Sequence, residues 1–209
     1  MADENFWNRT ARRYAASPIS DEAAYEATTA RIEALLRPAD DVLEIGCGTG
    51  STALRLAPAV RSVLATDSAA EMIAIAREKA AGVPNIRFDA ADAREAGRGE
   101  TFDAVLALNL LHLLPDPDAV MRAAVARLRP GGVLFTKTAC LGGWRAGLFG
   151  PLVGGLRLIG KAPALRFLTP AAVEGMHRNA GLAIEDRLLQ PGPAPRLFLV
   201  GRLSGPVGG

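Results

Sequence analysis

The chain has 209 residues, a formal net charge of +2 and a hydrophobic share of 49%. This length suits one domain with a full core, and the hydrophobic share argues against disorder. The sequence shows no secretory signal and no apolar run long enough to span a membrane. Its 2 cysteines are too few for a disulfide framework. The absence of a secretory signal and of a disulfide framework makes a reducing cytoplasm the expected location. No basic–aromatic interleaving suggests nucleic acid and no Cys/His cluster has metal spacing, so we expect neither a nucleic-acid partner nor a metal site.

The first 138 residues indicate two helices followed by an alternating strand–helix pattern. Residues 5–16 and 21–36 read as helices, with Pro18 between them and Pro38 ending the second. From residue 40 to residue 138, short apolar strands alternate with helices. This alternation predicts a parallel sheet with crossover helices.

The first strand runs into a glycine-rich turn. Residues 42–45 are strand-like, Gly46, Gly48 and Gly50 follow, and residues 51–57 begin a helix. Glycine permits a sharp turn and close approach to a ligand. A dinucleotide fingerprint would place its third glycine one residue later, at Ser51, and Glu44 would repel a pyrophosphate. The turn therefore predicts a nucleotide-sized site that favours a cationic ligand.

Two further strands end at acidic residues. Asp67 ends the strand 62–66 and could bind both hydroxyls of a ribose, or cap the next helix through a Ser68–Glu71 capping box. Met72 on that helix could cover an adenine face or simply join the core. After the strand 85–90, Asp92 is followed by the small residue Ala93 and is either a ligand contact or a solvated loop acid.

The fourth strand, residues 102–108, runs into a leucine-rich loop that contains His112. A turn over 128–134 then feeds a fifth strand to Lys137 or Thr138. Ligands bind at the carboxyl edge of such sheets, and an unperturbed histidine titrates near ~6.5. We therefore nominate His112 as the general base, the alternative being a histidine packed at a helix start.

The remaining residues depart from the alternating pattern. Glycines interrupt the apolar residues of 141–168, which predicts two short helices. That segment is either a cap over the site or a basic amphipathic flap that contacts a membrane surface. Thr169 and Pro170 then start a helix that ends at Gly181, and residues 182–188 and 196–203 form two late strands before a loose tail from residue 204.

Three features together resemble the class I S-adenosylmethionine (SAM) dependent methyltransferases. They are the run Glu-Ile-Gly-Cys-Gly-Thr-Gly at 44–50, the acids at the ends of the next two strands, and the turn Leu-Arg-Pro-Gly-Gly-Val-Leu at 128–134. The resemblance is to their small-molecule, lipid and quinone branch. It implies a Rossmann-like α/β sheet of seven strands, mostly parallel with the last antiparallel, and helices on both faces. It also implies one domain: an N-terminal helical lid (1–38), a SAM-binding core (39–140), an acceptor-side cap (141–168) and a C-terminal helix and hairpin (169–203).

The resemblance assigns cofactor contacts along the chain. The methionine part of SAM would lie against Glu44, Gly46, Cys47 and Gly48, the ribose against Asp67 and Ser68, the adenine against Met72, Asp92 and Ala93, and the sulfonium near Asn109 and Leu110. The opening Trp7-x-x-x-Ala11-x-x-Tyr14 resembles lids in which the tyrosine closes over the methionine end.

The function that follows is methyl transfer from SAM to a small or lipid-like acceptor, with no metal. Because the sulfonium is an activated donor, positioning can suffice without a catalytic triad. Asn109-Leu110-Leu111-His112 stands where methyltransferases of nucleic-acid bases or glutamine carry Asn/Asp-Pro-Pro-aromatic, which disfavours those acceptors. The alternatives are a SAM-binding sensor or partner subunit without catalysis, and a nicotinamide oxidoreductase.

Overall fold

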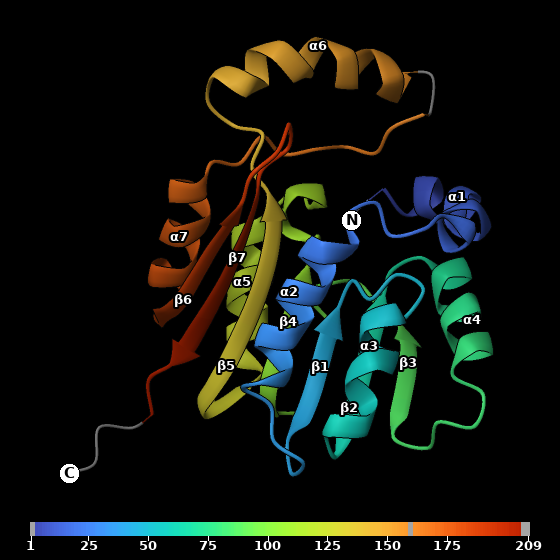
Figure 1. Ribbon diagram of the computed structural model, residues 1–209, viewed down its shortest axis with the longest axis vertical. Coiled ribbons are helices and arrows are strands. Elements are labelled where there is room, and N and C mark those ends of the chain that lie inside the picture. Colours follow the sequence, from blue (N-terminus) through green and yellow to red (C-terminus); the bar gives the residue numbers. More distant parts are fainter. Residues whose placement is uncertain (1–2, 159–160, 206–209) are drawn as a thin grey trace.

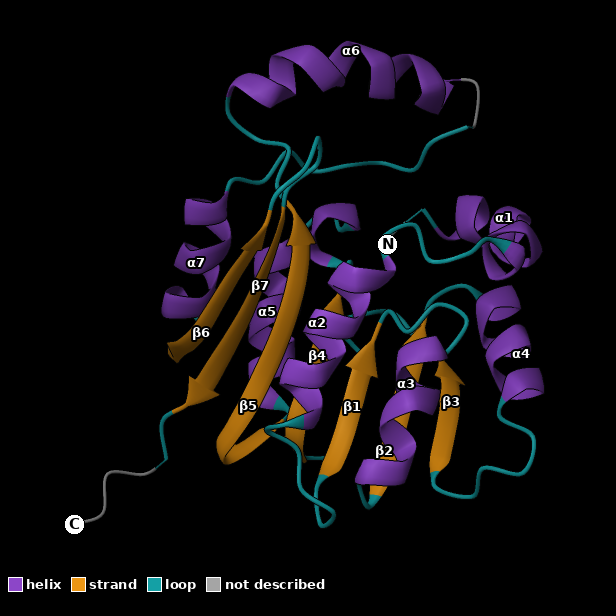
Figure 2. Ribbon diagram, viewed as in Figure 1, coloured by secondary structure: helices purple, strands orange, loops and turns teal. Residues whose placement is uncertain are grey.

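The computed structural model describes residues 3–158 and 161–205, and the strands of this part form one seven-stranded sheet. Its order is β3-β2-β1-β4-β5-β7-β6 (Figure 2). The strands are β1 (Asp41–Ile45), β2 (Ser62–Asp67), β3 (Ile86–Ala90), β4 (Phe102–Leu108), β5 (Leu128–Ala139), β6 (Leu182–Gln190) and β7 (Arg196–Leu203). The neighbours among β1 to β5 pair in parallel, and β7 is antiparallel to both β5 and β6. The predicted fold class is confirmed.

Helices cover both faces of the sheet (Figure 1). They are α1 (Glu4–Ala16), α2 (Glu22–Glu33), α3 (Ser51–Leu56), α4 (Ala70–Lys79), α5 (Pro117–Ala126), α6 (Trp144–Leu158) and α7 (Pro170–Asn179), with short 3-10 turns η1 (Ala57–Ala59) and η2 (Leu111–Leu113). Apolar side chains of α2, α3 and α4 share one buried cluster, and those of α5 and α7 share another. The two clusters lie on opposite faces of the sheet.

The alternation of side chains along the strands explains this double core. On β1, Val42 joins the cluster under α2 and α3, whereas Leu43 joins the cluster under α5 and α7. Successive residues of a strand point to opposite faces, so a strand covered on both sides must be apolar at nearly every position. The one polar exception on β1 within this buried run is Glu44, which is buried at the strand's carboxyl end.

The order of the strands positions the site. From β1 the chain moves outward through β2 to β3, and then returns to place β4 on the other side of β1. A crevice forms at such a reversal, outside the carboxyl ends of the strands. The loops that follow β1 and β4 therefore meet there.

The segment 141–168 differs from its prediction. One helix, α6, spans Trp144–Leu158 with Pro151 inside it, where we expected two short helices. A proline removes a single backbone donor, and here the other turns of the helix continue around that loss. α6 lies beyond the carboxyl edge of the sheet (Figure 1). Ile159, which we counted among the apolar residues of the flap, lies outside the described residues.

Within the described ranges, none of the helices is both long and apolar enough to cross a membrane. α2 also does more than cover the crevice, because Ile32 is fully buried against the sheet. It is part of the packed core. The lid role of 1–38 and the membrane contact of 141–168 stay predictions.

Candidate active site

A cavity of about 640 Å³ opens at the carboxyl edge of the sheet, within the range of roughly 300–1,000 Å³ typical of small-molecule sites. Loops after β1, β2, β3 and β4 line it together with α1 and α2. Every residue that the sequence nominated lies on its wall: Tyr14, Glu44, Gly46, Cys47, Gly48, Asp67, Ser68, Met72, Asp92, Ala93, Asn109, Leu110 and His112. The nominated residues therefore surround one cavity, and their roles in binding stay predictions.

The turn after β1 is glycine-rich for steric reasons. Gly46 has a φ of 73°, and a Cβ placed there would lie 2.7 Å from the Leu110 side chain. The N–H groups of Gly46 and Cys47 both donate to the carbonyl of Thr66, at 2.7 and 2.9 Å, which fixes the turn against β2. Burial raises the pKa of the Cys47 thiol well above its usual range, so this side chain stays protonated and its backbone defines the turn.

Asp67 holds two loops together. One carboxylate oxygen accepts from the N–H of Gly48 at 2.9 Å, and the other accepts from the N–H of Ala69 at 2.9 Å. The Asp67 side chain therefore contacts the start of α4, in agreement with the helix-capping alternative. The predicted Ser68–Glu71 capping box is absent, however, because Ala69 and not Ser68 is the N-cap residue. Burial raises the pKa of Asp67 despite these hydrogen bonds.

Glu44 is a buried carboxyl group that lacks a full set of partners. It is 3% exposed, and its Oε2 has no hydrogen-bond partner among the described residues. Burial raises its pKa to about 8, against the opposing effect of the Ala53 N–H, and the neighbouring Asp67 raises it further. A buried orphan oxygen on a cavity wall is expected where a ligand supplies the missing partner.

The predicted adenine-side residues lie on the same wall. Met72 is buried against Ala11, Ala69 and Ile75, so it belongs to a small core and also reaches the cavity. Burial opposes ionisation of Asp92, but the Arg94 N–H and guanidinium outweigh it and lower the pKa of this carboxyl. Asp92 therefore stays ionised beside the cavity.

α1 supplies an aromatic pair at the cavity mouth. The rings of Trp7 and Tyr14 meet edge to face with centroids 5.9 Å apart. Tyr14 is 53% exposed and its ring lies above Gly48, 3.9 Å from where a Cβ would stand. Burial of the hydroxyl, together with Asp67 and Glu44, raises its pKa. The phenol is thus a neutral donor facing two carboxyl groups.

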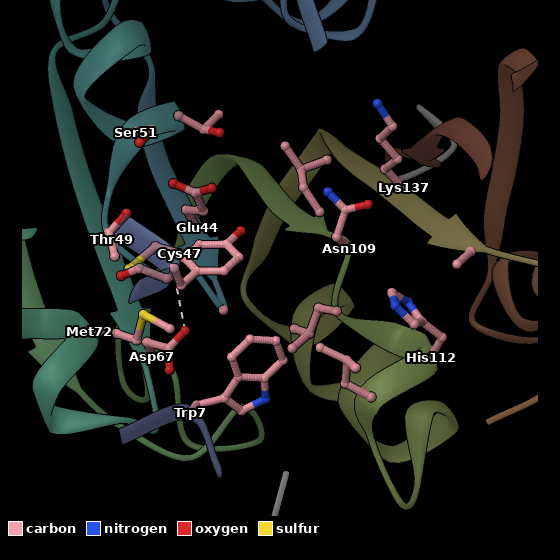
Figure 3. Close-up of a pocket in the computed structure, with 18 of the residues that line it drawn as sticks. Trp7, Glu44, Cys47, Thr49, Ser51, Asp67, Met72, Asn109, His112 and Lys137 are labelled. Carbon is pink, nitrogen blue, oxygen red and sulfur yellow. Dashed lines mark hydrogen bonds between the residues drawn. The ribbon is translucent and has the colours of Figure 1, made fainter. Parts of the chain in front are cut away.

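The loop after β4 forms the opposite wall (Figure 3). Asn109 has a φ of 55°, the sole positive value at a non-glycine position in the described residues, and its N–H donates to the Lys137 carbonyl at 2.7 Å. Such strain is common where a site requires it. Burial and the nearby Arg196 lower the pKa of His112 to about 4, and its Nδ1 has no partner in the described structure. His112 is therefore neutral at pH 7 and a weaker base than an exposed histidine.

The sequence reasoning did not nominate the lysines and arginines of this cavity, which are Lys79, Arg94, Lys137 and Arg196. Lys137 on β5 and Arg196 on β7 both line it, and the Lys137 ammonium donates to Thr28 Oγ1 at 2.9 Å and to the Ala24 carbonyl at 3.1 Å. Burial lowers the pKa of Lys137 to about 8, as does Arg196, while Asp21 opposes them. The one available signal was a lysine inside an otherwise apolar strand.

Comparisons with known proteins agree on one family. The family described as a methyltransferase domain matches residues 42–132. The ubiquinone biosynthesis O-methyltransferase of Xanthomonas axonopodis pv. citri (strain 306) is 35% identical over 164 residues, which cover 74% of this chain and 68% of that protein.

Solved structures agree on the fold. DhpI in complex with S-adenosyl-L-homocysteine (SAH) has a TM-score of 0.74 at 22% identity, and the match covers 97% of this chain and 96% of DhpI. The N-methyltransferase NodS from Bradyrhizobium japonicum WM9, bound to SAH, has a TM-score of 0.70 at 20% identity, and the match covers 96% of this chain and 98% of NodS. The nicotinamide interpretation is therefore set aside, and the chain belongs to the class I SAM-dependent methyltransferases.

Proposed function

We propose that this methyltransferase acts on the hydroxyl oxygen of a small phenol- or quinol-type acceptor. The relative that is 35% identical is named as an O-methyltransferase of ubiquinone biosynthesis, and this chain spans about two thirds of its length. The observation that carries the proposal is the division of one cavity into two sides. Glu44 and Asp67 define the carboxylate side, and Lys137 and Arg196, with the neutral His112 beside them, define the cationic side.

The carboxylate side fits a cationic nucleoside ligand. Glu44 has an unpartnered oxygen for an ammonium group, and the turn at Gly46 and Gly48 leaves room for close approach. In this proposal Asp67 and Ser68 hold the ribose, Asp92 and Ala93 the adenine, and Tyr14 covers the methionine end. When bound, SAM supplies an activated methyl group, so the chain needs chiefly to position the acceptor and exclude water.

The cationic side lies across the cavity and differs in chemistry (Figure 3). Lys137, Asn109 and His112 present nitrogen and amide groups, with Pro163 and Leu165 adding apolar surface. A ring that carries hydroxyl groups suits this mixture better than a quaternary amine or an unfunctionalised chain. In this proposal the acceptor occupies the cationic side.

The test begins with calorimetric titration of SAM, SAH and NAD, and continues with transfer of a tritiated methyl group to three acceptors. We expect both adenosyl compounds to bind and NAD to be silent. A catechol should take up label, its dimethyl ether should not, and an aminolipid should not. Label in the aminolipid alone would make this an N-methyltransferase, and SAM binding without transfer to any acceptor would favour a sensor or partner subunit.

A further inference from the structure

Lys137 and Arg196 share one face of the sheet at its carboxyl edge. β5 and β7 are antiparallel, with Ala139 opposite Arg196 and Lys137 opposite Phe198. Facing residues of a pair point to the same side, and diagonal neighbours lie roughly 7–8 Å apart, within reach of long side chains. The pairing of two strands distant in sequence therefore brings two cations to one cavity wall.

Within the described structure, Lys137 is held in place by hydrogen bonds to α2 and keeps one ammonium N–H free to bind a ligand. The residue is 6% exposed, and two of its three ammonium N–H groups donate hydrogen bonds to Ala24 and Thr28 on α2. Gln190 on β6 donates to the same Ala24 carbonyl at 2.9 Å, which further fixes this corner. The third ammonium proton of Lys137 has no acceptor among the described residues, although the side chain lines the cavity.

Arg196 adds a charge that the described structure does not neutralise. It makes no ion pair with any described carboxylate, although most arginines of the chain's surface do. The acids on this part of the cavity wall are Asp21, which caps α2 by accepting from the Ala24 N–H, and Asp116, which caps α5 in the same way. Each caps its helix through one oxygen and keeps its negative charge, but neither forms an ion pair with Lys137 or Arg196 in the described structure, so the two cations face the cavity without a carboxylate in contact.

His112 completes this group as a neutral side chain. Its ring nitrogen Nδ1 is buried without a partner in the described residues, and Arg196 lies close enough to disfavour a second positive charge. A neutral imidazole can accept or donate one hydrogen bond without adding charge. The wall therefore offers two cationic donors and one neutral contact, an arrangement that suits an acidic oxygen on an uncharged ring.

We propose that Lys137 and Arg196 form a subsite that binds the acceptor as its phenolate, the phenol proton having passed to solvent. This inference rests on the proposed function, since it names the ionisation state in which the cationic side takes a phenol. Charge-assisted hydrogen bonds from ammonium and guanidinium groups to an ionised oxygen are stronger than those to a neutral hydroxyl. The bound phenol should therefore be more acidic than the free one.

The experiment uses 4-nitrocatechol, whose phenolate absorbs visible light, with the full-length protein saturated with SAH. We expect the spectroscopic pKa of the bound probe to fall below that of the free probe. Arg196→Met and Lys137→Met should each return it toward the free value and weaken phenolate binding roughly tenfold to a hundredfold. Arg196→Lys should restore part of the shift, and Lys161→Met, at an exposed lysine outside the cavity wall, should leave it unchanged.

The two proposals fail separately. SAM binding without transfer of its methyl group to the catechol would overturn the proposed function. SAH binding with an unshifted probe, or with a shift that survives both Met variants, would overturn the phenolate subsite alone. Because Lys137→Met removes contacts to α2, its melting temperature is compared with wild type, and Arg196→Met carries the test if Lys137→Met unfolds.

Discussion

At the scale of single residues, Asp67 joins the turn after β1 to the start of α4. Its two oxygens accept from the N–H groups of Gly48 and Ala69. Each carboxylate oxygen has a further lone pair, so these bonds leave acceptor capacity toward the cavity. Ribose binding and helix contact, which sequence reasoning treated as alternatives, are therefore compatible.

Replacing Asp67 with Asn tests this double role. The amide oxygen can still accept one backbone hydrogen bond, but an NH2 group replaces the second oxygen. This group donates hydrogen bonds and cannot accept one from a ribose hydroxyl. We expect SAM affinity to fall by about 1–3 kcal/mol, measured by calorimetry. The matched control is Asp89→Asn, at a carboxylate on β3 outside the cavity wall. SAM affinity that stays equal to wild type in Asp67→Asn would remove Asp67 from the proposed ribose site.

Sequence reasoning nominated residues whose placement depends on near neighbours, and these residues line one cavity. The glycines of 46–50 and the acids after β2 and β3 follow from a local strand–turn–helix pattern, so their positions were readable. Lys137 and Arg196 were missed because β5–β7 pairing, and not sequence spacing, brings them together. His112 lies on the cavity wall, and its role as a base stays a prediction; its pKa depends on burial and on Arg196, which sequence spacing does not reveal.

At the scale of elements, α1 is held to the body of the protein by one side and faces the cavity with the other. Ala11 is buried with Met72 and Ile75 of α4, whereas Trp7 and Tyr14 line the cavity. The Asn8 side chain also accepts from the Glu71 N–H at 3.0 Å. α1 is therefore anchored on α4, and its aromatic pair can contact a ligand without being part of the main core.

Truncating the aromatic face of α1 should thus affect binding more than folding. For Tyr14→Ala we expect SAM affinity to fall by about 1–2 kcal/mol, because one hydroxyl donor and its covering ring are lost. The melting temperature without ligand should change little, since this side chain is half exposed. Calorimetry and thermal melts measure the two quantities. The control is Ile19→Ala, an exposed residue of the cavity rim outside α1, and equal affinity losses in both variants would argue against a specific role for Tyr14.

α6 shows where composition misleads at this scale. Its glycines and Pro151 predicted two helices, because each residue lowers local helix propensity. Propensity is a weak guide once a helix has formed, and the structure carries one helix through Pro151. The helix from Pro170 was predicted correctly, since its start depends on a local cap in which Thr169 accepts from the Ala172 N–H at 3.2 Å.

At the scale of the whole molecule, the parallel part of the sheet was predictable because most of its strands are short apolar runs, and parallel strands need crossover helices. The final order β5-β7-β6 came from the family resemblance and not from periodicity. Packing both faces of this sheet leaves its carboxyl edge as the place for polar side chains. Glu44 shows the consequence, since a carboxyl group on a fully packed strand is stable there chiefly in its protonated form.

That protonation links the stability of the ligand-free protein to pH. The pKa of Glu44 is raised to about 8 in the folded state from an ordinary value near 4.5, so the folded protein binds more protons than the unfolded chain between these values. The free energy of unfolding must therefore fall as pH rises through this window. The lowered pKa values of His112 and His177 act in the opposite direction, but only below about pH 6.5. Lys137, with a pKa lowered to about 8, acts mainly above that value.

The interval from pH 6.5 to 8 thus isolates the buried carboxyl group of Glu44 from the histidines and from Lys137. We expect the melting temperature of the ligand-free protein to decrease across it, by roughly 2–4 °C for each kcal/mol lost. Glu44→Gln, which cannot ionise, should remove most of this slope, whereas Glu185→Gln on β6 should keep it.

A cationic ligand on the carboxylate side favours ionised Glu44, so bound SAM should flatten the slope of the wild-type protein. SAM binding at pH 7 should then release protons. Calorimetry would show this release as a binding heat that depends on the ionisation enthalpy of the buffer. A slope that is unchanged in Glu44→Gln would mean that this carboxyl group is already ionised in the folded protein.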